Sequence, residues 1–284
     1  MKVFITSNCA GAASLGVALD QLHSAGFNKI ELSGGHTCSQ ADFEKIFSLK
    51  DAGVDFLIHH YFPPPSVPFV LNLSSDDAEI RQQTFEHIDQ AIALAQRLGS
   101  DFYSVHAGYA LDQIPRMTKS GIFEQIQKEP VSEDNFYASL ETLSARLPQG
   151  FRVALENGIP TTQPHLATPD QFFRFLDFIQ AIPNLGLLID LAHLKVSSTH
   201  YGFDMKELLE SIVVKYSEQI YELHISANDG TADSHFMCAA DSFEISFLVE
   251  HKGLLEDVPV VMEWHNCLTS ESRSTFEQIE SLLR

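Results

Sequence analysis

The stretch from Tyr221 to His235, YELHISANDGTADSH, carries side chains that could bind a metal ion: His224, Asp229, Asp233 and His235. Carboxylate oxygens and neutral imidazoles are the ligands that hold zinc, manganese and similar divalent ions. The alternation in Tyr-Glu-Leu-His-Ile-Ser is typical of a strand, and an Asn-Asp-Gly turn follows it. The sequence therefore predicts a histidine at the carboxyl end of a strand and carboxylates in the next loop, where parallel α/β proteins keep their chemistry.

Strand-like and helix-like segments alternate along the whole chain. Apolar runs predict strands at 2–8, 28–34, 54–60, 101–108, 151–157, 185–190, 220–226 and 258–264. Apolar residues at helical spacing, with capping or glycine signals at several ends, predict helices at 14–26, 40–52, 75–99, 133–147, 169–181, 203–216, 241–252 and 270–283. A further helix is expected near 118–128, in the long excursion after the fourth strand.

This alternation indicates a single (β/α)₈ TIM barrel domain over residues 1–284. Alternating units imply parallel strands with right-handed crossovers, and eight units in a chain of 284 residues fit a closed barrel better than an open sheet. The strand runs are nearly continuous in apolar residues, as strands buried on both faces should be. Pro63, Pro64 and Pro65 mark a stiff loop after the third strand and not a domain boundary.

A closed barrel brings the carboxyl ends of its strands to one mouth. The third strand ends with His59 and His60. The fourth strand ends with a Val-His pair, and the match of His59 to this histidine favours His59 as the inward residue. The other candidates at the mouth are His106, Glu156, Asp190, His193, His224 and Glu263, with Asp233 and His235 in the seventh loop. Because six of the eight strands end in such residues, the sequence predicts a divalent metal centre.

The charge and the cysteine content argue against several classes of protein. The formal net charge is −20, with 38 acidic and 18 basic residues, which disfavours nucleic acid and anionic membranes as partners. Four cysteines without a Cys-x-x-Cys spacing argue against a zinc ribbon or a disulfide framework, and a reduced cytoplasmic setting is expected. No run reaches the roughly 20 apolar residues of a membrane helix. Whether the chain forms a homo-oligomer stays open.

The chain resembles the xylose isomerase-like barrel superfamily from LIHHYF through YSVHAG, ALEN, LIDLAHL and ELHISANDGTADSH to VMEW. That superfamily includes sugar-phosphate isomerases and epimerases, ketose 3-epimerases and endonuclease IV-type AP endonucleases. In the epimerases one metal ion is held at the ends of strands five to eight, and the matching positions are Glu156, Asp190, His224 and Glu263. The resemblance implies that Glu156 and Glu263 are the catalytic acid and base and that His193 contacts the substrate, while the metal polarises substrate oxygens.

The nuclease branch of the superfamily implies a competing function with three zinc ions. The resemblance gives matching positions for the extra ligands: His59 or His60, His106, His193, Asp233 and His235. Ser234 stands where that branch usually has arginine, and Trp264 and His265 stand where it tends to have Thr-Pro. The strong negative charge is a third departure, and the FMCAADS segment lacks the Gly-x-Gly turn of many relatives in both branches.

Other residues at the strand ends are candidates to line a substrate pocket. Aromatic side chains that can stack on a sugar ring are Tyr61, Phe62, Tyr109 and Trp264. Asn157 follows Glu156 and is expected to contact the substrate. The basic residues near the mouth are few: Arg116, Lys119 and Lys195. A phosphorylated substrate is therefore open but slightly disfavoured.

These observations predict a metal-dependent isomerase or epimerase of a small sugar, with one to three zinc or manganese ions per chain. Phosphodiester hydrolysis of the AP endonuclease kind is the alternative enzyme function. A barrel that binds sugar without turnover is a third class. The chain has no Gly-x-Gly-x-x-Gly and no Gly-x-Ser-x-Gly motif, so neither a dinucleotide nor a serine nucleophile is indicated.

Overall fold

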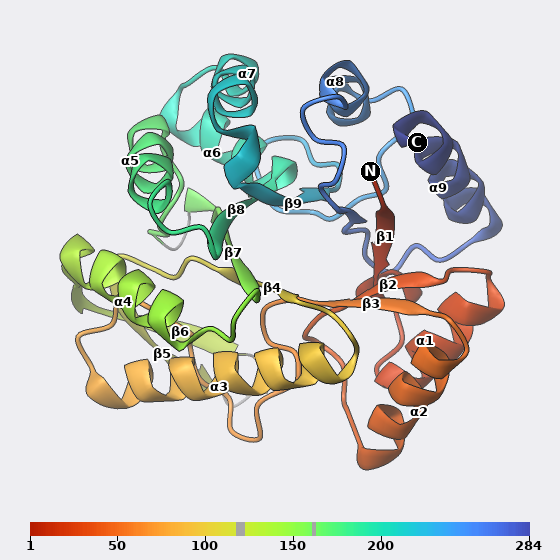
Figure 1. The fold of residues 1–284 in the computed structure, drawn as a ribbon, viewed down its shortest axis with the longest axis horizontal. Coiled ribbons are helices and arrows are strands. Elements are labelled where there is room, and N and C mark those ends of the chain that lie inside the picture. Colours follow the sequence, from red (N-terminus) through yellow and green to blue (C-terminus); the bar gives the residue numbers. More distant parts are fainter. Residues whose placement is uncertain (118–122, 161–162) are drawn as a thin grey trace.

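Eight parallel strands form a barrel in the computed structural model, which describes residues 1–117, 123–160 and 163–284 (Figure 1). They are β1 (Val3–Thr6), β2 (Lys29–Leu32), β3 (Asp55–Ile58), β4 (Phe102–His106), β7 (Arg152–Glu156), β8 (Leu185–Asp190), β9 (Ile220–Ile225) and β10 (Val260–Met262). The sheet order is β3-β2-β1-β10-β9-β8-β7-β4, and a parallel bridge between His59 and Ser104 joins the two outer strands. The predicted (β/α)₈ barrel is confirmed.

Helices surround the strands (Figure 1). They are α1 (Leu15–Ser24), α2 (Gln40–Asp51), α3 (Ala78–Arg97), α4 (Glu133–Arg146), α5 (Pro169–Ile179), α6 (Leu191–Tyr201), α7 (Met205–Tyr216), α8 (Phe243–His251) and α9 (Ser270–Leu283). Local sequence explains their starts. The Asp77 side chain accepts from the Glu79 N–H at the start of α3, and α5 has a capping box between Thr168 and Gln171 with Pro169 in its first turn.

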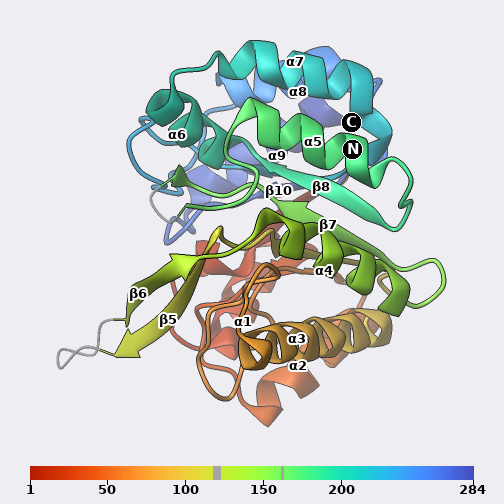
Figure 2. The same cartoon turned by 90° about the vertical axis from the view of Figure 1, so that its left-hand side faces the viewer.

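Two segments differ from the predictions. The helix expected near 118–128 is wrong for 123–128, because β5 (Leu111–Met117) and β6 (Phe123–Pro130) form an antiparallel hairpin there; 118–122 lies outside the described residues. The apolar residues Phe123 and Ile126 fit a helical spacing, but cross-strand pairing with β5 decides their structure. Figure 2 shows this hairpin extending away from the barrel. Helix α6, which the sequence did not predict, begins directly after Asp190.

Strand alternation divides the interior of the barrel into an apolar layer and a polar layer. A small buried cluster of residues from six strands forms the apolar layer: Phe4, Leu57, Phe102, Ala154, Leu188 and Val261. Two residues further along the chain, on the same side of the sheet, come Glu156 and Asp190 at the ends of β7 and β8 and Glu263 directly after β10. Carboxylates therefore lie at the mouth of the barrel, at the carboxyl ends of the strands. Apolar side chains fill the barrel below them.

The buried imidazole of His165 gives a prediction on acid stability. Its Nε2 contacts the Ser74 Oγ, its ring stacks on Phe136 at 4.2 Å, and burial lowers its pKa to about 4. An unfolded histidine takes up a proton near pH 6.5, so this group stabilises the fold above that pH and the contribution is lost as the pH falls towards 4. The loss should reach about 3 kcal/mol.

Urea unfolding at several pH values between 7 and 4 checks this expectation. The His165→Gln variant should lose stability less steeply than the wild type over this range. The same exchange at the exposed His23 is the control and should keep the wild-type slope. Identical slopes for wild type and His165→Gln would contradict the assignment.

Candidate metal centre

Glu156, at the end of β7, lies at the centre of the site and is 1% exposed. Its Oε2 is 3.2 Å from His59 Nε2 and 3.0 Å from His106 Nε2. Its Oε1 is 3.2 Å from His193 Nδ1 and 4.0 Å from His224 Nδ1. Neither oxygen has a well-formed hydrogen bond to the described residues. One carboxylate thus has imidazoles from four separate segments of the chain around it.

The predicted quartet of Glu156, Asp190, His224 and Glu263 comes together at the mouth. One ligand atom of each of the four lies within 4.8 Å of all the others. Buried atoms of this quartet lack hydrogen-bond partners in the described chain: both oxygens of Glu156, Asp190 Oδ2, His224 Nδ1 and Glu263 Oε2. Buried polar atoms without partners are costly, so this donor set fits a divalent ion.

Two further groups of ligand side chains flank the quartet. His59, His106 and Glu156 form one group, so Glu156 belongs to both this group and the quartet. In the other, Asp233 Oδ2 is 3.1 Å from His193 Nε2 and 2.7 Å from His235 Nε2. All five side chains that the sequence proposed as extra ligands therefore lie beside the quartet.

The imidazoles are held by the surrounding scaffold. The Nδ1 of His59 contacts Ser104 Oγ at 3.1 Å, and the Nδ1 of His193 contacts the Asn157 carbonyl at 2.8 Å. The Nδ1 of His235 is 3.2 Å from the Glu263 carbonyl. In each ring the other nitrogen, Nε2, faces a carboxylate. Such bonds fix the ring orientation and the tautomer, as in metal sites where a second shell orients the ligands.

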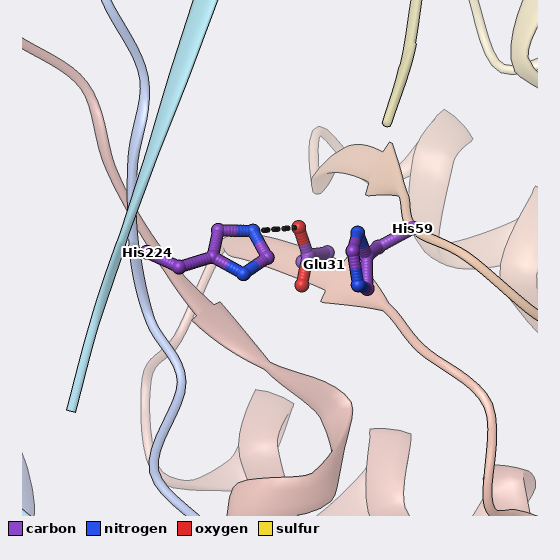
Figure 3. Close-up of side chains that lie close together, drawn as sticks. All are labelled: Glu31, His59 and His224. Carbon is purple, nitrogen blue, oxygen red and sulfur yellow. Dashed lines mark hydrogen bonds and ion pairs between the residues drawn. The ribbon is translucent and has the colours of Figure 1, made fainter. Parts of the chain in front are cut away.

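Glu31 on β2 holds His224 and was missed by sequence reasoning. Its Oε2 is 3.1 Å from His224 Nε2 (Figure 3). Its Oε1 accepts a hydrogen bond from Ser33 Oγ. His224 Nδ1 is thereby left facing Glu263 Oε2 at 3.4 Å. The sequence feature that could have pointed to Glu31 is a single carboxylate within the short strand Lys29–Leu32. A fully buried charge requires a partner, and Glu31 is fully buried.

The electrostatics of the site are those of buried, mutually compensating charges. Burial tends to raise the pKa of Glu156, but the charges of His106 and His59 outweigh it and hold that pKa well below its usual range. Burial raises the pKa of Asp190 well above its usual range. Burial tends to lower the pKa of His224, but Glu31 and Glu263 raise it well above the ordinary value. These carboxylates attract positive charge, and a divalent ion competes with imidazole protons for them.

Comparison with known proteins assigns the fold to a family. A family model described as a xylose isomerase-like TIM barrel matches residues 19–278. The chain belongs to this family. A curated relative is the uncharacterized protein MJ1311 of Methanocaldococcus jannaschii, which is 26% identical over 239 residues, covering 83% of this chain and 73% of that protein.

Solved structures share the barrel fold with this chain at low sequence identity. A D-tagatose 3-epimerase-like protein has a TM-score of 0.72 and 22% identity, covering 100% of this chain and 97% of the other. Endonuclease IV from Thermus thermophilus has a TM-score of 0.61 and 13% identity, covering 100% of this chain and 99% of the other. Both branches that the sequence suggested are therefore among the structural neighbours. None of the helices in the described ranges combines the length and apolar character needed to cross a membrane.

Most of the residues proposed to bind substrate are buried in the protein. Phe62 and Trp264 are fully buried, and the carboxamide of Asn157 bonds to the backbone N–H and carbonyl of Asp190. Tyr61 is half-buried, and its hydroxyl lies between the backbone of Phe69 and Leu71. A direct substrate contact by Phe62, Trp264 or Asn157 stays a prediction.

The remaining candidates near the mouth are placed as follows. His59, not His60, faces Glu156, whereas His60 stacks on His106 with 3.8 Å between ring centroids. Tyr109 is half-buried and pairs with Pro164 in an isolated bridge. Lys195 donates to the Asn228 carbonyl. Lys119 and the side chain of Arg116 lie outside the described part of the chain.

Replacing Glu31 with alanine should weaken metal binding. Without the carboxylate the His224 ring loses the contact that orients it, and loss of such a partner reduces metal affinity about 10- to 100-fold. Zinc affinity measured by competition with a chromogenic chelator checks this, with circular dichroism to confirm the fold. Glu31→Gln keeps an acceptor oxygen and should lose less, and Glu207→Ala on the surface of α7 is the matched control. An affinity of Glu31→Ala within about twofold of the wild type would refute the role of Glu31.

Proposed function

We propose that the chain is a metal-dependent isomerase or epimerase of a small sugar. The observation that carries the proposal is that Glu156, Asp190, His224 and Glu263 converge within 4.8 Å at the barrel mouth. The first three lie on β7, β8 and β9, and Glu263 directly follows β10. A zinc or manganese ion bound there would polarise the oxygens next to the reacting carbon. One ion at this quartet is enough for the isomerase reaction, and ions at the two flanking groups would bring the number to as many as three per chain.

Glu156 and Glu263 are the proposed acid and base. Both are buried, and Glu263 Oε2 lacks a hydrogen-bond partner within the described residues, so a carboxylate oxygen is available beside the metal ligands. One glutamate takes the proton from the sugar carbon and the other returns a proton to the substrate. A carboxylate has two oxygens, so it can hold a metal with one and move a proton with the other.

The neighbours and the charge support this choice. Solved structures of similar fold include the D-tagatose 3-epimerase-like protein and an L-ribulose 3-epimerase, the latter with a TM-score of 0.66 and 17% identity over 99% of this chain and 93% of the other. The net charge of −20 disfavours a nucleic-acid substrate. We further propose that residues 1–284 act as one domain in the cytoplasm, on a small molecule; a homo-oligomer is compatible with this proposal.

Replacing either glutamate with glutamine should abolish proton exchange at the reacting carbon. A ketose such as D-tagatose or L-ribulose, incubated with the manganese- or zinc-loaded protein in heavy water, should gain deuterium with the wild type. Exchange should fall by about 10²- to 10⁴-fold in Glu156→Gln and in Glu263→Gln.

Controls separate the loss of proton transfer from the loss of metal. Metal content and circular dichroism are measured on each variant, and Glu79→Gln on the exposed face of α3 is the matched surface exchange. Wild-type exchange in either site variant would remove that glutamate from the mechanism. No exchange by the wild type on any tested ketose, with either metal, would reject the isomerase proposal for those sugars.

Phosphodiester hydrolysis is the second candidate function, and a separate observation favours it. Both oxygens of Glu156 face imidazoles, with His59 and His106 on one side and His193 on the other. A carboxylate in this position suits a ligand shared by two ions. The additional Asp233 group provides for a third ion, as the endonuclease IV resemblance implies.

Metal content separates these two functions. The isomerase proposal expects about one ion per chain by elemental mass spectrometry, unchanged in His106→Ala and His235→Ala. Close to three zinc ions, falling in both variants, together with salt-sensitive cleavage of an abasic-site duplex, would place hydrolysis first. His23→Ala, at an exposed site on α1, controls for a general effect of removing a histidine.

A further inference from the structure

Two cysteines that are distant in sequence lie in contact at the mouth side of the barrel. The Sγ atoms of Cys9 and Cys267 are 3.6 Å apart. Cys9 lies in η1 (Ser7–Ala10), directly after β1, and Cys267 lies in the loop between β10 and α9. A disulfide needs sulfur atoms about 2 Å apart, so a small side-chain movement would bring the two sulfurs to bonding distance.

The backbone holds these two cysteines together. The N–H groups of Cys267 and Leu268 both donate to the Cys9 carbonyl, at 3.0 and 3.1 Å. The Asn266 N–H donates to the Asn8 carbonyl at 3.1 Å. Three hydrogen bonds therefore fix one short segment against the other. The proximity of the thiols is a property of the folded backbone and not of one side-chain rotamer.

The two thiols differ in their access to solvent and in their acidity. Cys9 is fully buried, whereas Cys267 is partly exposed. The hydrogen bond between them raises the pKa of the Cys9 thiol and lowers that of Cys267, as expected when Cys9 S–H donates to the Cys267 sulfur. Cys267 is therefore the thiol that an oxidant would reach first, with Cys9 in position to resolve the product.

We infer that Cys9 and Cys267 form an oxidisable pair that closes to an intramolecular disulfide in the presence of a hydroperoxide. The Cys267 thiolate attacks one peroxide oxygen, which gives a sulfenic acid and, for hydrogen peroxide, one water after protonation. The Cys9 sulfur then attacks the sulfenic sulfur and a second water leaves. Two thiols and one hydrogen peroxide thus give one disulfide and two waters.

The disulfide would join the segments that follow the first and last strands of the barrel. β1 and β10 are neighbours in the sheet, paired in parallel from Val3↔Val260 to Ile5↔Met262. The new bond would link positions 258 residues apart in the chain and enclose almost the whole barrel. Cross-links that close such long loops restrict the unfolded chain, so we expect oxidation to raise the melting temperature by roughly 5–10 °C.

The other two cysteines provide internal controls. Cys38 is partly exposed, and burial raises its pKa to about 11. Cys238 is buried, and this burial raises its pKa to about 12. Both are therefore poorer thiolates than Cys267, and neither should be consumed when the pair closes.

The test uses the full-length, fully reduced protein and stoichiometric hydrogen peroxide. After alkylation under denaturing conditions, mass spectrometry should show two modifiable thiols lost and a cross-linked peptide containing Cys9 and Cys267. The melting temperature should rise, and dithiothreitol should reverse both changes. Cys38→Ser should behave like the wild type, whereas Cys267→Ser should keep its remaining thiols and its unshifted melting temperature.

Several results would overturn the inference. Four free thiols after treatment, a cross-link from Cys267 to Cys238, or sulfinic acid at Cys267 with Cys9 still reduced would each exclude the proposed pair. The peptide map of the wild-type protein decides between these outcomes even if Cys267→Ser does not fold. Because the readouts are thiol content and melting temperature, they are independent of the proposed catalytic activity.

Discussion

The burial of carboxylates at the barrel mouth is the constraint on which the rest of the site depends. Glu156, Asp190 and Glu263 are each at most 7% exposed, and removing an ion from water costs several kcal/mol unless other groups compensate. The compensating groups are the imidazoles around them, and each of the orienting contacts from Ser104, Asn157 and Glu31 serves to aim a ring nitrogen at this centre. The same arrangement that makes these carboxylates costly to bury makes the centre a strong attractor for a divalent ion.

The apolar residues that stabilise the fold and the polar residues of the site occupy separate layers along the barrel axis. Apolar side chains such as Phe4 and Phe102 fill its lower interior, so the polar layer above rests on a well-packed base. The backbone near the site is strained at two residues. His60 and His235 have φ values of 45° and 46°, a region that residues other than glycine seldom adopt. Their surroundings enforce this backbone: His87 Nε2 and Tyr103 Oη both bond the His60 carbonyl, and His235 stacks on His265.

The two candidate chemistries use the same scaffold and differ in how many groups bind metal. Proton transfer on a sugar needs the quartet and two carboxylates with oxygens free to act. Phosphodiester hydrolysis uses the histidine groups on either side of the quartet as well. Structural neighbours of both kinds share the fold, and fold alone does not decide function. The occupancy of the groups around His106 and Asp233 is therefore the property that separates them.

The sequence by itself determined the eight strands of the barrel and most of its helices, because periodicity and capping signals are local features. It also placed Glu156, Asp190, His224 and Glu263 at strand ends, and the family resemblance singled them out as a quartet. The match with the Val-His end of the fourth strand was also enough to favour His59 over His60. Only the tertiary structure decided the hairpin β5–β6, whose pairing depends on the partner strand and not on the spacing of Phe123 and Ile126. The tertiary structure alone revealed the role of Glu31, because this buried carboxylate on β2 orients His224, which is 193 residues away in the chain. Contacts of this kind exist only when the barrel closes, and no local pattern in the chain records them.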